Sequence, residues 1–399
     1  MLAVAQHWAL PRSPRWANYL LNFFFRNMKK VSRRGFVEQV GWGLGASLLL
    51  PAVEALAAPQ APPDAGKKLR VALCGLGRYA NLVREGLAAS QYGQLAGIVT
   101  GTPAKAAQWQ SAYGIPAQNV YTYQNFDTIL ANKSIDAVYI TLPNALHKDF
   151  TLRAAKAGKH VIVEKPMALT EQDCQAMIAA CQRAGVQLAV GYRLHYEPNH
   201  LEIKRLGQEK VFGQVRLIEA SLGYRLADIS PDDWHLKKAL AGGGPLMNLG
   251  VYCVQSSRYV LGEEPVAVSA QFGPVTMPRL FTEVEESITW QLYFPSGAVC
   301  TSTATATCNI DRFFASADKG YFELSPGLSY GPFKGGSSQG AFNFPVINQQ
   351  AAQLDGIATY LLANKPLPTH NSGEEGRKDL RVLDGIYKAA RSGGKVTLA

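Results

Sequence analysis

The feature that most constrains this fold is a glycine-rich turn placed directly after a short apolar segment. Residues 69–74 have the composition of a buried parallel strand, and the turn that follows reads Gly75-Leu76-Gly77-Arg78-Tyr79-Ala80. In this G-x-G-x-x-A pattern the first glycine permits a tight turn, the second lets a pyrophosphate approach the backbone, and the small last residue lets a helix pack on the strand. Because residues 80–89 are helical in pattern, the sequence predicts a dinucleotide-binding loop here.

The chain after the second strand indicates which dinucleotide the loop would hold. A site that prefers NAD places an acidic residue near the end of this strand, where it binds the ribose 2′-hydroxyl. Here no Asp or Glu occurs between Glu85 and Asp127. Hydroxyls and cations stand there instead, namely Thr100, Gly101, Thr102 and Lys105, with Arg78 in the glycine loop. These groups would hold a 2′-phosphate that an acid would repel, so the sequence favours NADP over NAD. The alternative for Lys105 is a solvated helix residue.

Strands and helices alternate as far as residue 192. After the first strand, further strands are expected at residues 95–100, 136–141, 160–163 and 187–191. This alternation predicts a doubly wound parallel sheet, a Rossmann domain over residues 69–192. Ligands of such sheets lie beyond the carboxyl ends of the strands, where Thr100, Asn144 and Lys165 all fall.

From residue 193 to residue 399 the pattern becomes that of a second domain. Strands are expected at residues 215–222, 266–272, 287–293, 298–305, 313–316 and 320–324, and helices at residues 348–363 and 374–391. Strands of this length favour a large, mostly antiparallel sheet, so the predicted fold class is α/β plus α+β. A Gly-rich turn at residue 242 leads into a helix that would carry Asn248 and Tyr252 on one face. A packed core helix with satisfied polar groups is the alternative interpretation.

The first 57 residues are predicted to be a leader. Arg33-Arg34 precedes a diluted apolar stretch over residues 40–53, and Ala55-Leu56-Ala57 has the pattern of a cleavage site. The paired arginines are typical of a twin-arginine signal, and the stretch is shorter than the ~20 residues of a spanning helix. We therefore expect export to the periplasm and no membrane association after cleavage, with residues 58–68 left as a short linker. An uncleaved membrane anchor is the alternative.

The distribution of charge and the spacing of the cysteines indicate whether nucleic acid or a metal ion is expected as a partner. The net charge is +10, but residues 1–57 hold seven of the 40 basic and two of the 30 acidic residues, which leaves 33 against 28 elsewhere. The basicity is therefore largely a property of the leader, and we expect no nucleic-acid partner. The six cysteines show no metal-ligand spacing, so we expect inert thiols and no metal. His195 and His200 are five residues apart, and core or surface histidines are commoner than a metal pair.

Together these motifs resemble the Gfo/Idh/MocA oxidoreductase family, and in particular its glucose–fructose oxidoreductase branch. The resemblance covers roughly residues 69–395. Besides the glycine loop, it is carried by Leu142-Pro143-Asn144 with His147, by Glu164-Lys165-Pro166, by Gly191-Tyr192-Arg193 and by the run from Gly242 to Tyr252. The branch is exported with NADP already bound, which suits a twin-arginine leader. The family usually has Asp at the position of Asn248, and the branch has a longer arm than residues 58–68.

The resemblance implies roles for individual residues. Lys165 would be the active-site lysine and Tyr252 the acid/base, in a hydride transfer between nicotinamide C4 and a sugar carbon. Asn248 and Arg193 would bind the substrate, and the family further implies a homo-oligomer, a dimer or a tetramer. The residues expected to contact the cofactor are Gly75, Leu76, Gly77, Arg78, Tyr79, Thr100, Gly101, Lys105, Leu142, Asn144, His147, Glu164 and Lys165.

These inferences favour one function over two others. The favoured one is a periplasmic NADP-dependent sugar oxidoreductase that couples oxidation of an aldose to reduction of a second sugar with bound cofactor. An exported NAD-dependent glycoside hydrolase of the same fold is one alternative. A non-catalytic sugar or nucleotide sensor is the other, although a sensor would not need both Lys165 and Tyr252.

Overall fold

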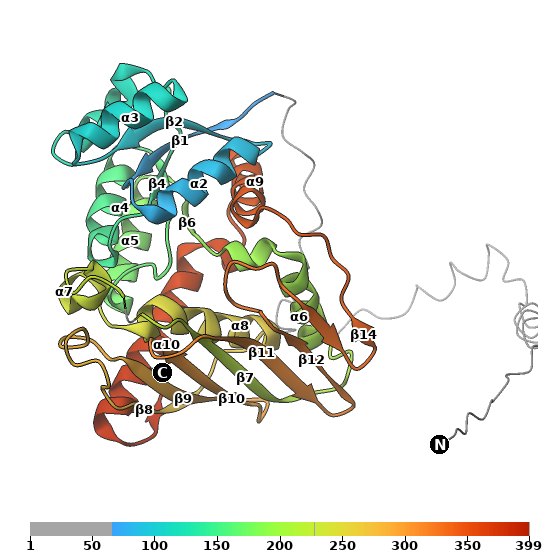
Figure 1. The fold of residues 1–399 in the computed structure, drawn as a ribbon. Coiled ribbons are helices and arrows are strands. Elements are labelled where there is room, and N and C mark those ends of the chain that lie inside the picture. The colour runs from blue at the N-terminus through green and yellow to red at the C-terminus, as the bar shows by residue number, and fades with distance from the viewer. Residues whose placement is uncertain (1–65, 227, 399) are drawn as a thin grey trace, which may run out of the picture. The chain divides into compact units, whose positions relative to one another are not determined.

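A computed structural model describes residues 66–226 and 228–398, and its first half is built on a parallel sheet (Figure 1). The order β3-β2-β1-β4-β5-β6 is that of a Rossmann sheet, and every adjacent pair is parallel. The strands are β1 (Leu69–Cys74), β2 (Gly93–Val99), β3 (Val120–Tyr121), β4 (Ala137–Ile140), β5 (His160–Val163) and β6 (Leu188–Val190). The helices between them are α2 (Arg78–Ala89), α3 (Pro103–Tyr113), α4 (His147–Lys156) and α5 (Glu171–Arg183).

The parallel sheet forms because its central strands are almost wholly apolar. All four residues of β4 are buried, as are Val161, Ile162 and Val163 of β5. Strands covered by helices on both faces need such continuous apolar runs, since neither face meets water. Helix α5 begins where the Thr170 side chain accepts a hydrogen bond from the N–H of Asp173, a standard N-cap. The predicted doubly wound sheet is confirmed.

The second half of the chain forms a nine-stranded sheet. Its order is β14-β13-β12-β11-β7-β10-β9-β8-β15; only the β7–β10 pair is parallel. The strands are β7 (Val215–Gly223), β8 (Ala267–Phe272), β9 (Ser287–Tyr293), β10 (Val299–Thr305), β11 (Ile310–Ala317), β12 (Gly320–Leu324), β13 (Gly335–Ser337), β14 (Gly340–Ala341) and β15 (Val396–Thr397). The predicted large, mostly antiparallel sheet is confirmed.

Burial alternates along this sheet because only one of its faces is covered. In β9, Ile288, Trp290 and Leu292 are buried, whereas Thr289 and Gln291 between them are exposed. Helix α8 (Val251–Leu261) packs on β7 and β10, and α10 (Gly373–Ser392) packs on β8. Helix α6 (Pro198–Gln208) packs in turn on α8.

Helix α9 (Gln349–Leu362) returns from the second sheet to the first. Leu354, Ile357 and Leu361 on α9 share an apolar core with residues of β1 and α2. The approach is close, since a Cβ on Gly86 of α2 would come within 2.6 Å of the Gln350 Cβ. Helix α10 also packs on α5, so the two sheets belong to one compact unit.

The leader and most of the linker lie outside the described residues, so the twin-arginine signal stays a prediction. No helix within residues 66–226 and 228–398 is long and apolar enough to cross a membrane. Cys308 is exposed and the other five cysteines are buried as free thiols. In the same ranges no three His, Cys, Asp or Glu side chains are grouped to hold a metal ion.

Candidate active site

A cleft opens where the carboxyl ends of β1, β4 and β5 face the second sheet. Its main cavity has a volume of about 550 Å³ and extends from Gly77, in the glycine loop, to Lys165 and Tyr252. A smaller cavity of about 130 Å³ adjoins it and also contains Lys165, together with Asn144 and His147. Open α/β sheets bind their ligands at this edge, so the cleft is the candidate active site.

The glycine loop has the geometry that a dinucleotide requires. Gly75 has φ +96°, and a Cβ there would lie 3.0 Å from the carbonyl oxygen of Thr141, so no other residue fits. At Gly77 the Cβ position has no neighbour within 4 Å, which leaves the backbone open to a ligand. Helix α2 begins at Arg78, so its positive N-terminal end faces the same space. A nicotinamide dinucleotide therefore fits these residues.

The residues expected near the 2′-phosphate lie together beside this loop. Lys105, on α3, donates a hydrogen bond of 3.2 Å to the carbonyl oxygen of Leu76. Thr100 is buried at the end of β2, and its hydroxyl accepts a 3.3 Å hydrogen bond from the N–H of Thr102. A Cβ on Gly101 would come within 2.9 Å of the Tyr123 ring, so the chain passes close to that side chain. The group is cationic and rich in hydroxyls, which suits a phosphate.

Lys165 and Tyr252 meet in the cleft although they come from different domains. The Lys165 ammonium lies 4.5 Å from the centroid of the Tyr252 ring. It also donates a 2.8 Å hydrogen bond to the main-chain carbonyl oxygen of Asn248. The structure thus brings the predicted lysine and phenol to one ligand-sized space.

Asn248 lies in a π-helical turn (Leu246–Gly250) and not in the regular helix that was expected. The turn leads into α8, which begins at Val251, one residue before Tyr252. Asn248 and Tyr252 nevertheless both line the main cavity, as predicted, and the Asn248 main-chain carbonyl accepts the hydrogen bond from Lys165. Gly250 lets the turn pack closely, since a Cβ there would be 3.0 Å from Trp290. Such π turns are frequent at functional sites.

Arg193 is buried, and it lines the main cavity beside two aromatic rings. Its guanidinium carbon is 5.0 Å from the Tyr252 ring centroid and 4.4 Å from that of Tyr330. It donates to the carbonyl oxygen of Ser329 at 2.8 Å and to the side-chain oxygen of Gln349. These contacts give Arg193 a positioning role, and its predicted contact with substrate stays a prediction.

Glu164 is a buried carboxyl directly before Lys165. Tyr139 donates a 2.6 Å hydrogen bond to it, and Gln353 of α9 donates in turn to the Tyr139 oxygen at 2.7 Å. Burial raises the pKa of Glu164 above its ordinary value. Gly191 leaves the room it needs, because a Cβ there would lie 2.4 Å from a Glu164 oxygen. Glu164 therefore anchors the chain directly before Lys165.

His147 and Asn144 are tied to the main chain around the cleft. The His147 ring nitrogens lie 2.8 Å from the carbonyl oxygen of Leu142 and 3.0 Å from that of Pro166. Burial lowers the pKa of His147, while its hydrogen bonds to main-chain carbonyl oxygens act in the opposite direction. Asn144 donates a 2.9 Å hydrogen bond to the carbonyl oxygen of Ala241. These side chains fix the loops after β4 and β5, and their cofactor contacts stay predictions.

The main cavity is also lined by four aromatic side chains that were not predicted as site residues from the sequence. They are Tyr224, Trp234, His235 and Tyr330. Tyr224 directly follows β7, Trp234 and His235 lie in the 3₁₀ helix Trp234–Leu236, and Tyr330 lies in a loop. No fixed spacing relates them to Lys165 or Tyr252. The one available signal is an aromatic residue in a Gly- and Pro-rich loop over residues 327–332.

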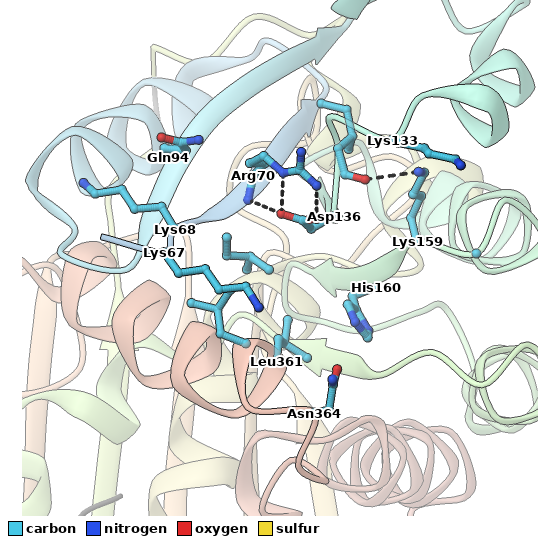
Figure 2. Close-up of a pocket in the computed structure, with 14 residues that line it drawn as sticks. Lys67, Lys68, Arg70, Gln94, Lys133, Asp136, Lys159, His160, Leu361 and Asn364 are labelled. Atoms are coloured by element: carbon cyan, nitrogen blue, oxygen red, sulfur yellow. Dashed lines mark hydrogen bonds and ion pairs between the residues drawn. The ribbon is translucent and has the colours of Figure 1, made fainter. Parts of the chain in front are cut away.

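A second cavity, of about 640 Å³, lies at the amino ends of the parallel strands (Figure 2). Its only acidic lining residue is Asp136, which accepts hydrogen bonds of 2.6 and 2.9 Å from the Arg70 guanidinium and one of 2.8 Å from the Arg70 main-chain N–H. The cationic residues and the histidine of its lining are Lys67, Lys68, Arg70, Lys133, Lys159 and His160.

Three of these cations are already bound by the protein itself. Besides the Arg70 pair, Lys68 donates to the carbonyl oxygen of Ser90, the C-cap of α2. Lys159 donates a 2.7 Å hydrogen bond to the carbonyl oxygen of Asn132, the C-cap of the 3₁₀ helix Phe126–Ala131. Helices end at this edge of a parallel sheet with negative partial charge, which attracts cations. The charge of this cavity is therefore explained by the fold, and we assign no ligand to it.

Comparison with known proteins identifies the family. Residues 69–192 match the model of the oxidoreductase family with an NAD-binding Rossmann fold, and residues 200–323 match the GFO/IDH/MocA C-terminal domain. The chain belongs to the Gfo/Idh/MocA oxidoreductase family. The predicted family, fold class and NAD(P)-dependent oxidoreductase chemistry are thus confirmed.

Two relatives are similar over most of the chain. The D-xylose 1-dehydrogenase (NADP(+)) of Haloarcula marismortui is 27% identical over 292 residues, which cover 70% of this chain and 79% of that protein. The crystal structure of an aldose-aldose oxidoreductase from Caulobacter crescentus, complexed with glycerol, is 40% identical with a TM-score of 0.80. That match covers 83% of this chain and 100% of the other.

Proposed function

We propose that this protein is an exported NADP-dependent oxidoreductase that transfers hydride between a carbon of an aldose and nicotinamide. We further propose that it returns the hydride to a second sugar while the cofactor stays bound. The observation that carries the proposal is the 4.5 Å approach of the Lys165 ammonium to the Tyr252 ring, in a cavity that begins at the glycine loop. The names of the two relatives support an aldose as substrate and NADP as cofactor.

The cofactor would be held by residues of the Rossmann half. Its pyrophosphate would lie over Gly77 and the start of α2, and its 2′-phosphate beside Thr100, Gly101 and Lys105. When bound, NADP supplies a nicotinamide C4 that accepts or returns a hydride. The remaining chemistry belongs to side chains of this protein.

During hydride transfer, Tyr252 transfers the proton of the sugar hydroxyl and Lys165 stabilises the negative charge on the sugar oxygen. Oxidation of a CH–OH group would release one hydride, for which bound NADP⁺ would be the acceptor, and one proton, which the Tyr252 oxygen would accept as a phenolate. The Lys165 ammonium stabilises negative charge on the sugar oxygen while that proton leaves. Lys165 and Arg193 lie near the Tyr252 ring, at 4.5 and 5.0 Å, and stabilise charge on the phenolic oxygen as well. In the reverse direction the same phenol protonates the carbonyl that receives the hydride.

The compartment gives the reason to expect recycling of the cofactor. A free pool of NADP is not expected outside the cytoplasm, so an exported enzyme needs a second substrate to restore the oxidised cofactor. The twin-arginine route carries folded proteins and so suits a protein that acquires its cofactor before export. The leader sequence Arg33-Arg34 supports this part of the proposal.

A spectral cycle tests the reaction. The NADP-loaded protein should show reduced-nicotinamide absorbance when an aldose is added, and a second sugar should abolish that absorbance. Protein that binds NADP but remains oxidised across a broad panel of aldoses would contradict the proposal. If the aldose reduces NADP⁺ but no second sugar reoxidises it, the dehydrogenase activity would be supported and the coupled second step would be contradicted.

Cell fractionation tests the export separately. We expect the Arg33→Lys, Arg34→Lys double variant to remain in the cytoplasm, because the twin-arginine route reads the arginine pair and not charge alone. The matched control is Lys29→Arg with Lys30→Arg, which changes a neighbouring basic pair and should still be exported. Equal export of both variants would contradict the twin-arginine assignment.

A further inference from the structure

The aromatic side chain of Tyr330 lies in the cleft, and the proposed reaction assigns it no role. It lines both adjoining cavities, and 52% of its surface is exposed, whereas the Tyr252 exposure is 6%. An exposed aromatic ring inside a concave site is a common means of holding a ligand with an apolar face.

The loop that carries Tyr330 is held in place by distant elements. The Asp311 carboxylate on β11 accepts hydrogen bonds of 2.6 to 3.2 Å from the main-chain N–H groups of residues 327–329. Gln349 at the start of α9 donates to the Tyr330 carbonyl oxygen at 3.0 Å. These hydrogen bonds fix the main chain that carries the ring, so the loop loses little conformational entropy when a ligand binds.

The neighbours of the ring place it between the two halves of the cleft. The Arg193 guanidinium lies 4.4 Å from the Tyr330 ring centroid and 5.0 Å from that of Tyr252, so one cation contacts both rings. The ring of Tyr79, in the glycine loop, is 6.5 Å from that of Tyr330. Tyr330 therefore reaches from the second domain to the dinucleotide loop, close to the acid/base.

We propose that Tyr330 determines substrate specificity by receiving the apolar C–H face of a pyranose on its exposed ring. A pyranose presents C–H groups on its faces and hydroxyls around its rim, which suits a flat aromatic surface backed by Arg193. The platform holds a cyclic aldose with its reacting carbon toward Lys165 and Tyr252, and it gives an acyclic polyol no comparable contact. This inference rests on the proposed function.

Two variants of Tyr330 and one control test the platform. Tyr330→Ala removes the ring, and Tyr330→Phe keeps it without the hydroxyl. The control is Tyr113→Ala: Tyr113 is 42% exposed and has the Arg84 guanidinium 5.0 Å from its ring centroid, but it lies at the end of α3 and does not line the cleft. The readouts are KM and kcat, and sugar binding to NADP⁺-loaded protein followed by tryptophan fluorescence, since Trp234 lines the same cavity.

We expect Tyr330→Ala to raise KM and Kd for D-glucose and D-xylose about tenfold, with a smaller change in kcat. Values for the acyclic D-glyceraldehyde should change by less than about twofold, and Tyr330→Phe should retain most of the pyranose affinity. Equal weakening for D-glyceraldehyde, loss of affinity in the Phe variant, or a rise in KM for NADP⁺ alone would overturn the platform.

Binding and turnover separate this inference from the proposed function. If D-glucose binds in a Tyr330-dependent manner but NADP⁺ is not reduced, the platform stands and the proposed reaction fails. If the wild-type protein binds neither pyranose, the platform is overturned directly.

Discussion

Strand β5 has a lysine beyond each of its ends, and the two lysines meet different surroundings. Lys159 precedes the strand and donates hydrogen bonds of 2.7 and 3.1 Å to the carbonyl oxygens of Asn132 and Ile135. Lys165 follows it and lies 4.5 Å from the Tyr252 ring, in the cleft. Both lysines line cavities, and the cavity at the amino edge is the larger, at about 640 Å³ against about 550 Å³.

The contrast shows that cavity size and charge do not by themselves define a site. At the amino edge the helices end in partial negative charge, so cations there stabilise the fold. At the carboxyl edge helices begin, strands end and a second domain contributes a phenol, so a cation there can act on a ligand. If this account is right, the two lysines should fail in different ways when they are replaced.

The largest effect should follow from Lys165→Met. Loss of the ammonium removes the charge that stabilises the sugar oxygen, and we expect kcat to fall about 10³-fold. The thermal midpoint should fall only slightly, since Met preserves the apolar stem and one carbonyl oxygen, that of Asn248 beside the open cleft, loses its partner. Steady-state kinetics and thermal unfolding of one preparation measure both. A variant that keeps more than about a tenth of the wild-type kcat would contradict the role of Lys165.

Tyr252→Phe should have the next largest effect. It keeps the ring beside Lys165 but removes the group that carries the proton, so we expect kcat to fall roughly 10²-fold or more while NADP⁺ still binds. Tyr259→Phe is the matched control, because Tyr259 lies on the same helix α8 but does not line the cleft. Similar losses in both variants would indicate a packing effect of α8 instead.

Lys159→Met should change stability and leave turnover intact. Two carbonyl oxygens at the amino edge lose their partner, and we expect the free energy of unfolding to fall by about 1–2 kcal/mol. Denaturant unfolding measures this change, and kcat per folded molecule should match the wild type. The exposed Lys133 lines the same cavity, and Lys133→Met should stay within about 0.5 kcal/mol. A loss of turnover in Lys159→Met would contradict a purely structural role for the lysine at the amino edge of the sheet.

Lys105 sharpens the comparison, because it donates to a carbonyl oxygen like Lys159 but stands at the carboxyl edge. If the position of Lys105 at the carboxyl edge of the sheet means that it binds the cofactor's 2′-phosphate, Lys105→Ala should weaken NADPH binding about tenfold and NADH binding hardly at all. Titration of both reduced cofactors by fluorescence measures this difference. Equal weakening of both cofactors would assign Lys105 to loop structure.

The Rossmann half could be predicted because its signals are local. Gly75 and Gly77 are adjacent to the strand and helix that they join, and Lys165 follows a short apolar strand in a recognisable motif. The local backbone requires glycine at position 75, where φ is +96°. The resemblance of these motifs to one family then suggested Tyr252 as the partner of Lys165.

The substrate half could be predicted only in part, because it is assembled from segments far apart in sequence. Arg193 and Tyr330 meet only after the second sheet has formed, and neither segment has a periodicity that points to the other. The π turn at Asn248 was missed for a related reason, since close packing of Gly250 on Trp290 depends on tertiary structure. His147 carried a motif signal, but its hydrogen bonds to two carbonyl oxygens depend on loops that the motif alone does not place.

The most direct test of the account is the fate of the hydrogen on the anomeric carbon of an aldose. An aldose deuterated at that carbon is incubated with the protein and NADP⁺, and the mass of the cofactor is then measured. The account predicts NADPH that is one mass unit heavier than that formed from the unlabelled sugar, and formation of this NADPH about 10³-fold more slowly with Lys165→Met. Unlabelled NADPH, or a cofactor that stays oxidised while sugar is bound, would contradict direct hydride transfer in this cleft.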